Sequence, residues 1–235
     1  MTKEKTEPQV SLEDVEVALT KAEKFIEDNK KILIIVASAI IIVIGGIFLY
    51  KKVYLANKED EAQKQMFVAE QYFEKDSFNL ALNGNGSYPG FLEIIDDYGV
   101  TNSANLAHYY AGISFLRLGK FEDAIEQLKH FKTNDLLIAP ICLGALGDAY
   151  VEKGKLQEGV EYYVKAYNKN QNDITSPVYL MKAGQVYEDL GEYQKAIDTY
   201  KEIKKNYLKT SEGRQVDKYI TRASLELETK GSAKK

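Results

Sequence analysis

The sequence predicts an all-α protein, in which a single transmembrane helix is followed by a helical solenoid. Residues 32–50 form a run of nineteen residues without a charged side chain. At about 1.5 Å of rise per residue, a helix of this length reaches about 28 Å, close to the hydrocarbon thickness of a bilayer. From residue 105 onward, helix-compatible segments recur at intervals of 35 and 37 residues. Such a period is the signature of stacked helical repeats.

The composition excludes several classes of function. The 31 basic and 35 acidic residues give a net charge of −4, which is not the basic field that nucleic-acid binding requires. Cys142 is the only cysteine, so the chain has no intrachain disulfide and no multi-cysteine metal site. His108 and His130 show no recognisable metal-binding spacing, and no phosphate-binding loop, nucleophile elbow or HExxH motif is present. We therefore expect no enzyme activity, no cofactor, no metal, no small-molecule substrate and no nucleic-acid partner.

The expected organisation has five parts. Residues 1–31 are a tail with an amphipathic helix, residues 32–50 are the transmembrane helix, and residues 51–104 are a linker helix with a divergent first hairpin. Residues 105–208 hold three repeats, and residues 209–235 form a capping helix and a tail.

The N-terminal segment is polar up to residue 9 and then becomes helix-compatible. Ser11, followed three residues later by Asp14, suits a helix N-cap. Apolar residues follow at spacings of three and four, which predicts one apolar stripe. Its members are Leu12, Val15, Leu19, Ala22 and Ile26. The sequence leaves open whether this stripe binds a protein or lies on a lipid surface.

The apolar run at 32–50 is interpreted as an uncleaved anchor in the lipid bilayer. Two lysines flank it on each side, and long side chains of this kind can extend to both headgroup layers. The apolar part of a cleavable signal peptide is about 7–15 residues long and close to the N-terminus, whereas here thirty-one residues precede a longer run. A buried helix of a soluble core is the other alternative. Lysine counts near the span are equal on the two sides, so charge does not set its orientation.

Residues 53–82 contain no Pro or Gly and predict one continuous helix. Residues 83–90 are rich in turn formers, and residues 91–98 return to apolar side chains at helical spacing. The triplet Asn85-Gly86-Ser87 matches a glycosylation sequon, but we interpret it as part of this loop.

The repeat aligns on Gly112, Gly147 and Gly184, and similar residues follow each glycine at equal offsets. Three residues after each glycine stand Phe115, Tyr150 and Tyr187, and seven residues after it stand Gly119, Gly154 and Gly191. Nine residues after it stand Phe121, Leu156 and Tyr193, and twelve after it Ala124, Gly159 and Ala196. Sixteen residues after it stand Leu128, Tyr163 and Tyr200. The pattern resembles the tetratricopeptide repeat over residues 105–208. Small residues let two helices approach closely while large side chains fill the remaining volume.

Helix ends are also marked in the sequence. Gly119, Gly154 and Gly191 each follow a helical run and are expected to end the first helix of a repeat in the left-handed conformation. Pro140 and Pro177 are expected at the first position of their helices. After the repeats, residues 211–230 carry apolar side chains at helical spacing, which predicts a solubilising terminal helix.

The resemblance implies a concave, protein-binding groove lined by fixed positions of the first helix in each repeat. The implied residues are Leu106, Tyr109, Ile113, Leu116, Arg117, Ile141, Gly144, Asp148, Val151, Glu152, Val178, Met181, Gln185, Glu188 and Asp189. The groove is part apolar and part acidic, which favours apolar segments with some basic residues. It lacks the Lys and Asn of relatives that clamp the C-terminal carboxylate of cytosolic chaperones. Its apolar members are equally consistent with packing against a neighbouring helix.

The complete layout resembles that of YfgM-like ancillary subunits of the bacterial Sec translocon. This resemblance implies a single-pass, membrane-anchored protein-binding adaptor that contacts SecYEG, envelope chaperones or secretory chains. It also implies the inner membrane, with a cytoplasmic N-terminus and residues 51–235 in the periplasm. Three alternatives stay open: a periplasmic scaffold for cell-envelope or secretion-complex assembly, a cytoplasm-facing membrane adaptor, and, in a different class, an enzyme of unrecognised type.

Overall fold

The computed structural model describes residues 12–232, and these residues form helices and turns with no strand. The all-α prediction is therefore confirmed. The predicted tail and the predicted N-cap at Ser11 lie outside the described residues. The chain divides into two compact units, Met1–Ala56 and Asn57–Lys235, and each is described by itself.

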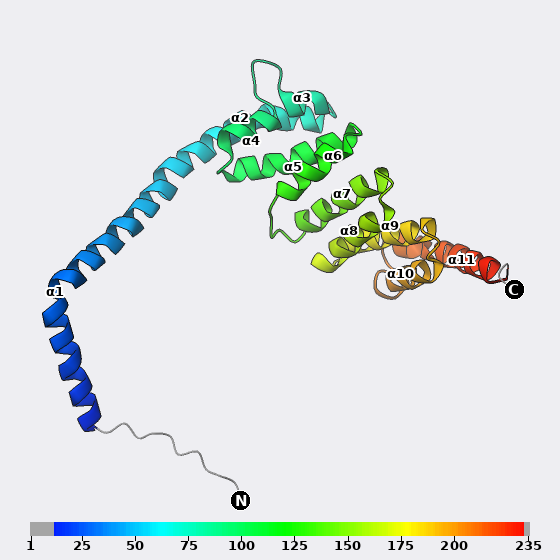
Figure 1. Cartoon of the computed structure of the whole chain (residues 1–235). Helices are drawn as coiled ribbons and strands as arrows, with labels where there is room; N and C mark the ends of the chain where they lie inside the picture. The colour runs from blue at the N-terminus through cyan, green and yellow to red at the C-terminus, as the bar shows by residue number, and fades with distance from the viewer. Residues whose placement is uncertain (1–11, 233–235) are drawn as a thin grey trace, which may run out of the picture. The chain divides into compact units, whose positions relative to one another are not determined.

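The first unit is dominated by helix α1 (Leu12–Leu49), which runs without a break through the predicted amphipathic segment and most of the predicted span (Figure 1). A short π-helix, Tyr50–Leu55, follows. The apolar side chains of α1 are exposed, and none of its most apolar window is buried. Within the described part of its own unit, α1 therefore has no protein partner that covers its apolar surface. A helix of this length and composition can cross a membrane or act as a signal sequence.

The amphipathic stripe is described only in part. Leu19 and Ile26 are exposed, and the side chains of Leu12, Val15 and Ala22 lie outside the described ones. What covers the stripe therefore stays a prediction.

In the second unit, the predicted continuous helix over residues 53–82 is wrong. The chain instead forms α2 (Ala56–Glu74) and α3 (Phe78–Asn83), separated by a turn at Asp76 with φ 55°. The N–H of Asp76 donates to the carbonyl of Phe73 at 3.0 Å, and the N–H of Ser77 donates to that of Tyr72 at 2.9 Å. Aspartate tolerates the left-handed conformation that closes such a helix end. The absence of glycine and proline therefore does not guarantee continuity.

The loop before α4 (Phe91–Tyr98) is an ordered turn around Asn85. The Asn85 side-chain oxygen accepts hydrogen bonds from the backbone N–H groups of Ser87 and Tyr88, at 3.0 and 2.9 Å. Its amide nitrogen donates to the Tyr72 hydroxyl at 2.9 Å. This geometry is consistent with the interpretation of the sequon as part of a loop, because the Asn85 side chain hydrogen-bonds the backbone of the turn.

Three antiparallel helix pairs follow, and a last helix packs on the end of the array (Figure 1). The pairs are α5 (Asn102–Arg117) with α6 (Phe121–His130), α7 (Ile138–Glu152) with α8 (Leu156–Lys169), and α9 (Ser176–Asp189) with α10 (Tyr193–Asn206). The terminal helix α11 (Ser211–Ser232) packs against α10 and α9. Helix α5 begins three residues earlier than expected because the Thr101 hydroxyl accepts from the N–H of Ala104 at 3.0 Å and caps it.

The pairing of small with large residues is confirmed. A Cβ placed at Gly147 would lie 2.5 Å from the ring of Tyr163, and a Cβ at Gly184 would lie 2.2 Å from the ring of Tyr200. Gly112 meets Leu128 in the same way, at 2.5 Å. Each glycine therefore lets a large side chain of the second helix lie directly on the backbone of the first.

The glycines that end the first helices lie as predicted, whereas the prolines near the helix starts do not. Gly119, Gly154 and Gly191 have φ values of 73°, 74° and 72°, which confirms the left-handed ends. The prolines do not occupy the first helical position: Pro140 is the third residue of α7 and Pro177 the second of α9. All N–H groups of the first turn lack an intrahelical acceptor, so proline is tolerated at each of these positions.

Candidate functional site

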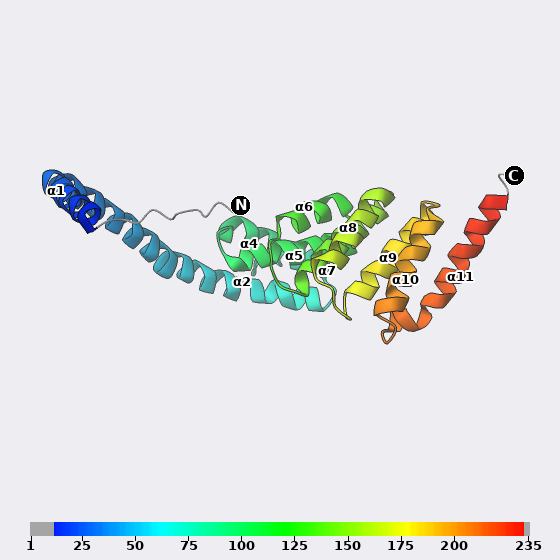
Figure 2. The same cartoon turned by 90° about the horizontal axis from the view of Figure 1, so that it is seen from below.

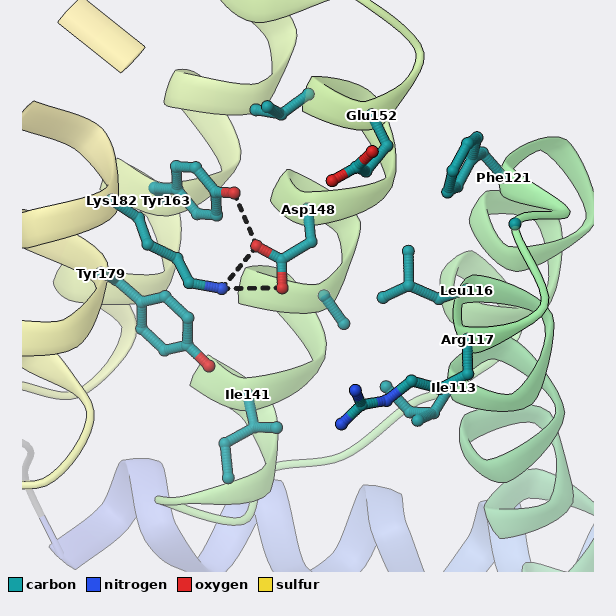
Figure 3. Close-up of a pocket in the computed structure, with 13 residues that line it drawn as sticks. Ile113, Leu116, Arg117, Phe121, Ile141, Asp148, Glu152, Tyr163, Tyr179 and Lys182 are labelled. Carbon is teal, nitrogen blue, oxygen red and sulfur yellow. Dashed lines mark hydrogen bonds and ion pairs between the residues drawn. The ribbon is translucent and has the colours of Figure 1, made fainter. Parts of the chain in front are cut away.

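A groove of about 730 Å³ opens along the first helices of the repeats (Figure 3). Helices α5, α7 and α9 supply most of its walls, with single contributions from α6, α8 and the turn after α5. The lining residues are Ile113, Leu116, Arg117, Gly119, Phe121, Ile141, Ala145, Asp148, Val151, Glu152, Tyr163, Tyr179 and Lys182.

The structure brings seven of the fifteen predicted groove residues together here. Those that line the groove are Ile113, Leu116, Arg117, Ile141, Asp148, Val151 and Glu152. The others lie outside its lining: Leu106, Tyr109, Gly144, Val178, Met181, Gln185, Glu188 and Asp189. The predicted residues of α5 and α7 are thus concentrated in the groove, and those of α9 are absent from it.

Several of the predicted residues that do not line the groove pack against neighbouring helices instead. This packing was the alternative that the sequence left open for the apolar positions. Tyr109 packs against Phe131 in a tilted arrangement, with ring centroids 5.3 Å apart, and burial raises the pKa of Tyr109. Met181 packs against the buried cluster formed by the last repeat and α11. Gly144 lies under Tyr179, whose ring a Cβ at this position would overlap. Counting positions along a helix does not tell a side chain that packs against a neighbouring helix from one that faces solvent. The rotation of each repeat relative to the next decides which of the two environments a position has.

Asp148 at the centre of the groove is neutralised. The Lys182 ammonium lies 2.6 and 2.8 Å from its two carboxylate oxygens, and the Tyr163 hydroxyl donates to one of them at 2.6 Å. Burial and the adjacent carboxylate raise the pKa of Tyr163, which therefore stays a donor. The expectation that Asp148 repels acidic partners is not supported by this geometry. Sequence reasoning missed Lys182 because its partner belongs to another repeat, 34 residues away.

Glu188 is likewise engaged, but beneath the terminal helix. The Arg222 guanidinium of α11 donates to both Glu188 oxygens at 2.8 Å, and the Tyr200 hydroxyl donates at 2.6 Å. The Glu188 side chain is only 11% exposed. Its predicted place in the groove is therefore wrong: the carboxylate anchors α11 on α9.

The groove is consequently balanced in charge rather than acidic. It holds two basic residues, Arg117 and Lys182, and two acidic ones, Asp148 and Glu152. Arg117 and Glu152 are exposed and form no ion pair within the described part of the chain. Figure 3 shows Arg117 and Lys182 on opposite sides of Asp148, coming from α5 and α9. Apolar side chains such as Leu116 fill the space between these charges.

The two histidines meet in the structure, although they lie on different helices. The rings of His108 and His130 stack with centroids 5.2 Å apart, and His108 Nδ1 lies 2.8 Å from the Gln127 side-chain oxygen. Within residues 12–232, no cluster of three or more His, Cys, Asp or Glu side chains is placed to hold a metal ion. Burial, and to a smaller extent His130, lower the pKa of His108, while the Gln127 hydrogen bond opposes this shift. His108 therefore favours the neutral state in the folded protein.

We predict that stability falls as the pH drops below about 6.5, the ordinary histidine pKa. The unfolded chain then binds more protons than the folded one, so the stabilisation that is present above this pH is lost toward the lower pKa of folded His108. Thermal unfolding at pH 7.5 and 5.5 measures the effect, with His108→Gln as the comparison. A smaller pH-dependent loss in the variant is expected, and an equal loss in both proteins would contradict the assignment.

Cys142 lies outside the groove lining and is not a reactive thiol. It is buried, its sulfur faces the Leu128 carbonyl at 3.5 Å, and burial raises its pKa to about 12. A thiol in this state is a packing residue rather than a nucleophile.

The repeats match known proteins in sequence and in structure. Residues 145–207 match a family described as tetratricopeptide repeat. A tetratricopeptide repeat-containing protein of Methanocaldococcus jannaschii is 30% identical over 132 residues, which cover 54% of this chain and 22% of that relative. The chain thus spans about a fifth of the length of this curated relative.

Two solved structures share the fold. The tetratricopeptide-like repeats of a putative kinesin light chain from Podosopora anserina match with a TM-score of 0.57 at 14% identity, covering 75% of this chain and 91% of that one. The MamA protein matches with a TM-score of 0.51 at 20% identity, covering 73% and 94%. The chain is therefore all-helical, matches the tetratricopeptide-repeat family over residues 145–207 and shares the fold of tetratricopeptide-like repeat structures. Such repeats imply a protein–protein interaction adaptor or scaffold, and scaffolds of this type are typically non-catalytic.

Proposed function

We propose that the chain is a membrane-anchored adaptor that binds a protein segment in the groove between α5, α7 and α9. The observation that carries this proposal is the groove itself: an open trough of about 730 Å³ lined by apolar side chains, with an unpaired charge of each sign at Arg117 and Glu152. Helix-lined grooves bind segments through spaced side-chain anchors, and fixed charges set which partners fit. A segment with apolar anchors and one residue of each charge complements this lining.

The anchor in this proposal is the exposed apolar run of residues 32–50, which lies in α1 up to Leu49 and ends at the first residue of the π-helix. Its length matches a bilayer, and none of its most apolar window is covered by protein. An anchor holds the groove near its partners, so modest affinity is sufficient.

The more specific proposal is an accessory subunit of the Sec translocon, in the inner membrane. Its support is the resemblance in layout: a short N-terminal segment, one span and a repeat domain. In this arrangement the N-terminus is cytoplasmic, residues 51–235 are periplasmic, and the groove binds SecYEG, an envelope chaperone or a secretory chain. An envelope scaffold or a cytoplasm-facing adaptor would have the same groove but different partners.

Photo-crosslinking in intact membranes tests the groove and its partners together. A photoreactive residue at position 117 or 152 is expected to give discrete adducts, because both side chains are exposed and border the groove. The matched control is position 185, which is exposed on α9 but does not line the groove. Adducts that are equally strong from position 185 would argue against the groove as the binding site.

Mass spectrometry of the adducts separates the candidate functions. SecYEG, envelope chaperones or nascent secretory chains would support the translocon proposal. Reproducible adducts with other envelope proteins would favour a scaffold, and adducts with cytoplasmic proteins alone would overturn both the translocon role and the topology.

A further inference from the structure

The loop between α3 and α4 contains two Asn-Gly pairs in succession, Asn83-Gly84 and Asn85-Gly86. Glycine has no Cβ, so the backbone nitrogen that follows such an asparagine can approach the side-chain carbonyl carbon and displace its amide. The loop leads into α4, which packs against α5 at the start of the repeats (Figure 2). The two pairs are alike in sequence, but their surroundings in the fold differ.

Asn83-Gly84 is held in an unreactive geometry. The N–H of Gly84 donates to the carbonyl of Leu80 at 2.8 Å, the hydrogen bond that closes α3. The side-chain nitrogen of Asn83 donates back to the carbonyl of Asn79 at 2.9 Å. A Cβ at Gly84 would lie 2.2 Å from the carbonyl oxygen of Tyr88, so the backbone here has little room to rearrange. The Gly84 nitrogen is therefore kept from the side chain of Asn83.

Asn85-Gly86 lies in the open part of the same loop. Both residues are exposed, and a Cβ at Gly86 would meet no atom within 4 Å. The N–H of Gly86 forms no hydrogen bond with any residue that the structure describes. This nitrogen can therefore lose its proton and turn toward the side chain of Asn85.

The turn activates the side-chain carbonyl of Asn85. Its oxygen accepts from the N–H groups of Ser87 and Tyr88 at 3.0 and 2.9 Å. Two donors on one carbonyl oxygen withdraw electron density from the carbon and stabilise the negative charge that forms on the oxygen when a nucleophile adds. The side-chain oxygen of Asn83, by contrast, accepts no hydrogen bond from the residues that the structure describes.

We propose that Asn85 deamidates spontaneously to aspartate and isoaspartate, while Asn83 keeps its amide. The Gly86 nitrogen forms a bond to Cγ of Asn85, and the bond from Cγ to Nδ2 breaks. The proton of the Gly86 nitrogen passes through water to the departing nitrogen, so ammonia leaves and a cyclic imide remains. Water then opens the ring: cleavage at Cγ gives aspartate, and cleavage at the backbone carbonyl gives isoaspartate. Water is the only co-reactant, and no atom is oxidised or reduced.

The products change the loop in two ways. Both place a negative charge within residues 83–90, which carry no charged side chain. Isoaspartate also directs the main chain through Cγ, so the carbonyl that accepts from Ser87 and Tyr88 is no longer a side-chain group. Hydrogen exchange at these two amides is expected to rise with the isoaspartate content. This chemistry depends on the loop alone and not on the groove or the anchor.

Peptide mapping by mass spectrometry compares the two asparagines in the same molecule. Residues 76–117 form one tryptic peptide, because no Lys or Arg lies between Lys75 and Arg117. The full chain is incubated folded in detergent at mildly alkaline pH, in water labelled with heavy oxygen, and electron-transfer fragmentation locates each new acid. Asn85 is expected to react at least about tenfold faster than Asn83, a ratio that corresponds to a barrier difference of about 1.4 kcal/mol.

The chain unfolded in urea is the control, because both Asn-Gly pairs are then exposed and should react at similar rates. Equal rates in the folded protein, or faster reaction at Asn83, would overturn the proposal. So would an Asn85 amide that persists in the folded protein while the unfolded chain reacts, or a glycan on Asn85 in protein isolated from membranes.

Gly86→Ala tests the attacking atom, since it places a Cβ beside the nitrogen that forms the new bond. The variant is expected to slow the reaction at Asn85 and to leave the rate at Asn83 unchanged, in both the folded and the unfolded chain. An unchanged rate at Asn85 would exclude attack by the Gly86 nitrogen.

Discussion

Gly147→Leu is expected to destabilise the repeat array by about 2 kcal/mol or more. A Cβ at this position would already lie 2.5 Å from two ring carbons of Tyr163, and the carbonyl of Gly159 is 3.2 Å away. Leucine in place of glycine improves helix propensity by about 1 kcal/mol, but overpacking a close helix contact costs about 1–3 kcal/mol and sometimes more. The contact is with a ring that is held by its own hydrogen bond to Asp148. The ring therefore has little freedom to move aside.

Thermal unfolding of the full chain in detergent measures this loss, and a fall in Tm of about 4–8 °C is expected for a domain of this size. Gln185→Leu is the matched control, because it adds the same side chain at an exposed position of α9. Combining Gly147→Leu with Tyr163→Ala should cost less than the sum of the two single changes, since the alanine removes the obstructing ring. An unchanged Tm in Gly147→Leu would show that the repeat alignment is wrong.

Arg222→Ala is expected to loosen the terminal helix α11 and to lower stability by about 2 kcal/mol. The change removes two charge-assisted hydrogen bonds and leaves the largely buried Glu188 carboxylate with the Tyr200 hydroxyl. Hydrogen bonds to charged groups contribute about 1.5–3 kcal/mol. Arg222 itself is 54% exposed, so water screens part of this pair and the loss should stay below the 3–5 kcal/mol typical of fully buried pairs.

Hydrogen exchange of the α11 amides is the sensitive measurement, because the expected event is local opening of the last helix. Arg214→Ala is the control: Arg214 lies on the same helix but is exposed and donates only to the Lys209 carbonyl. Adding Glu188→Gln to Arg222→Ala should restore part of the protection, since no unpaired carboxylate is then left. Equal exchange in Arg222→Ala and the natural chain would mean that apolar packing alone holds α11.

The groove shows where sequence reasoning reached its limit. Counting family positions placed Leu116 and Val151 in the groove, and both line it. The same count placed Met181 and Glu188 there, and both instead contribute to the packing of the last repeat and α11. Lys182 was missed, although it defines the charge of the groove together with Asp148.

The sequence by itself determined the all-helical fold, the repeat period, the left-handed glycines and the pairs of small and large residues. These features depend on spacings within one helix pair, and an example is the sixteen residues between Gly147 and Tyr163. Only the tertiary structure decided which charges are neutralised, because Asp148 and Lys182, like Glu188 and Arg222, come from elements 34 residues apart. Their encounter depends on the rotation of each helix pair on the next. Many small contacts across the stack set that rotation, and no local pattern records it.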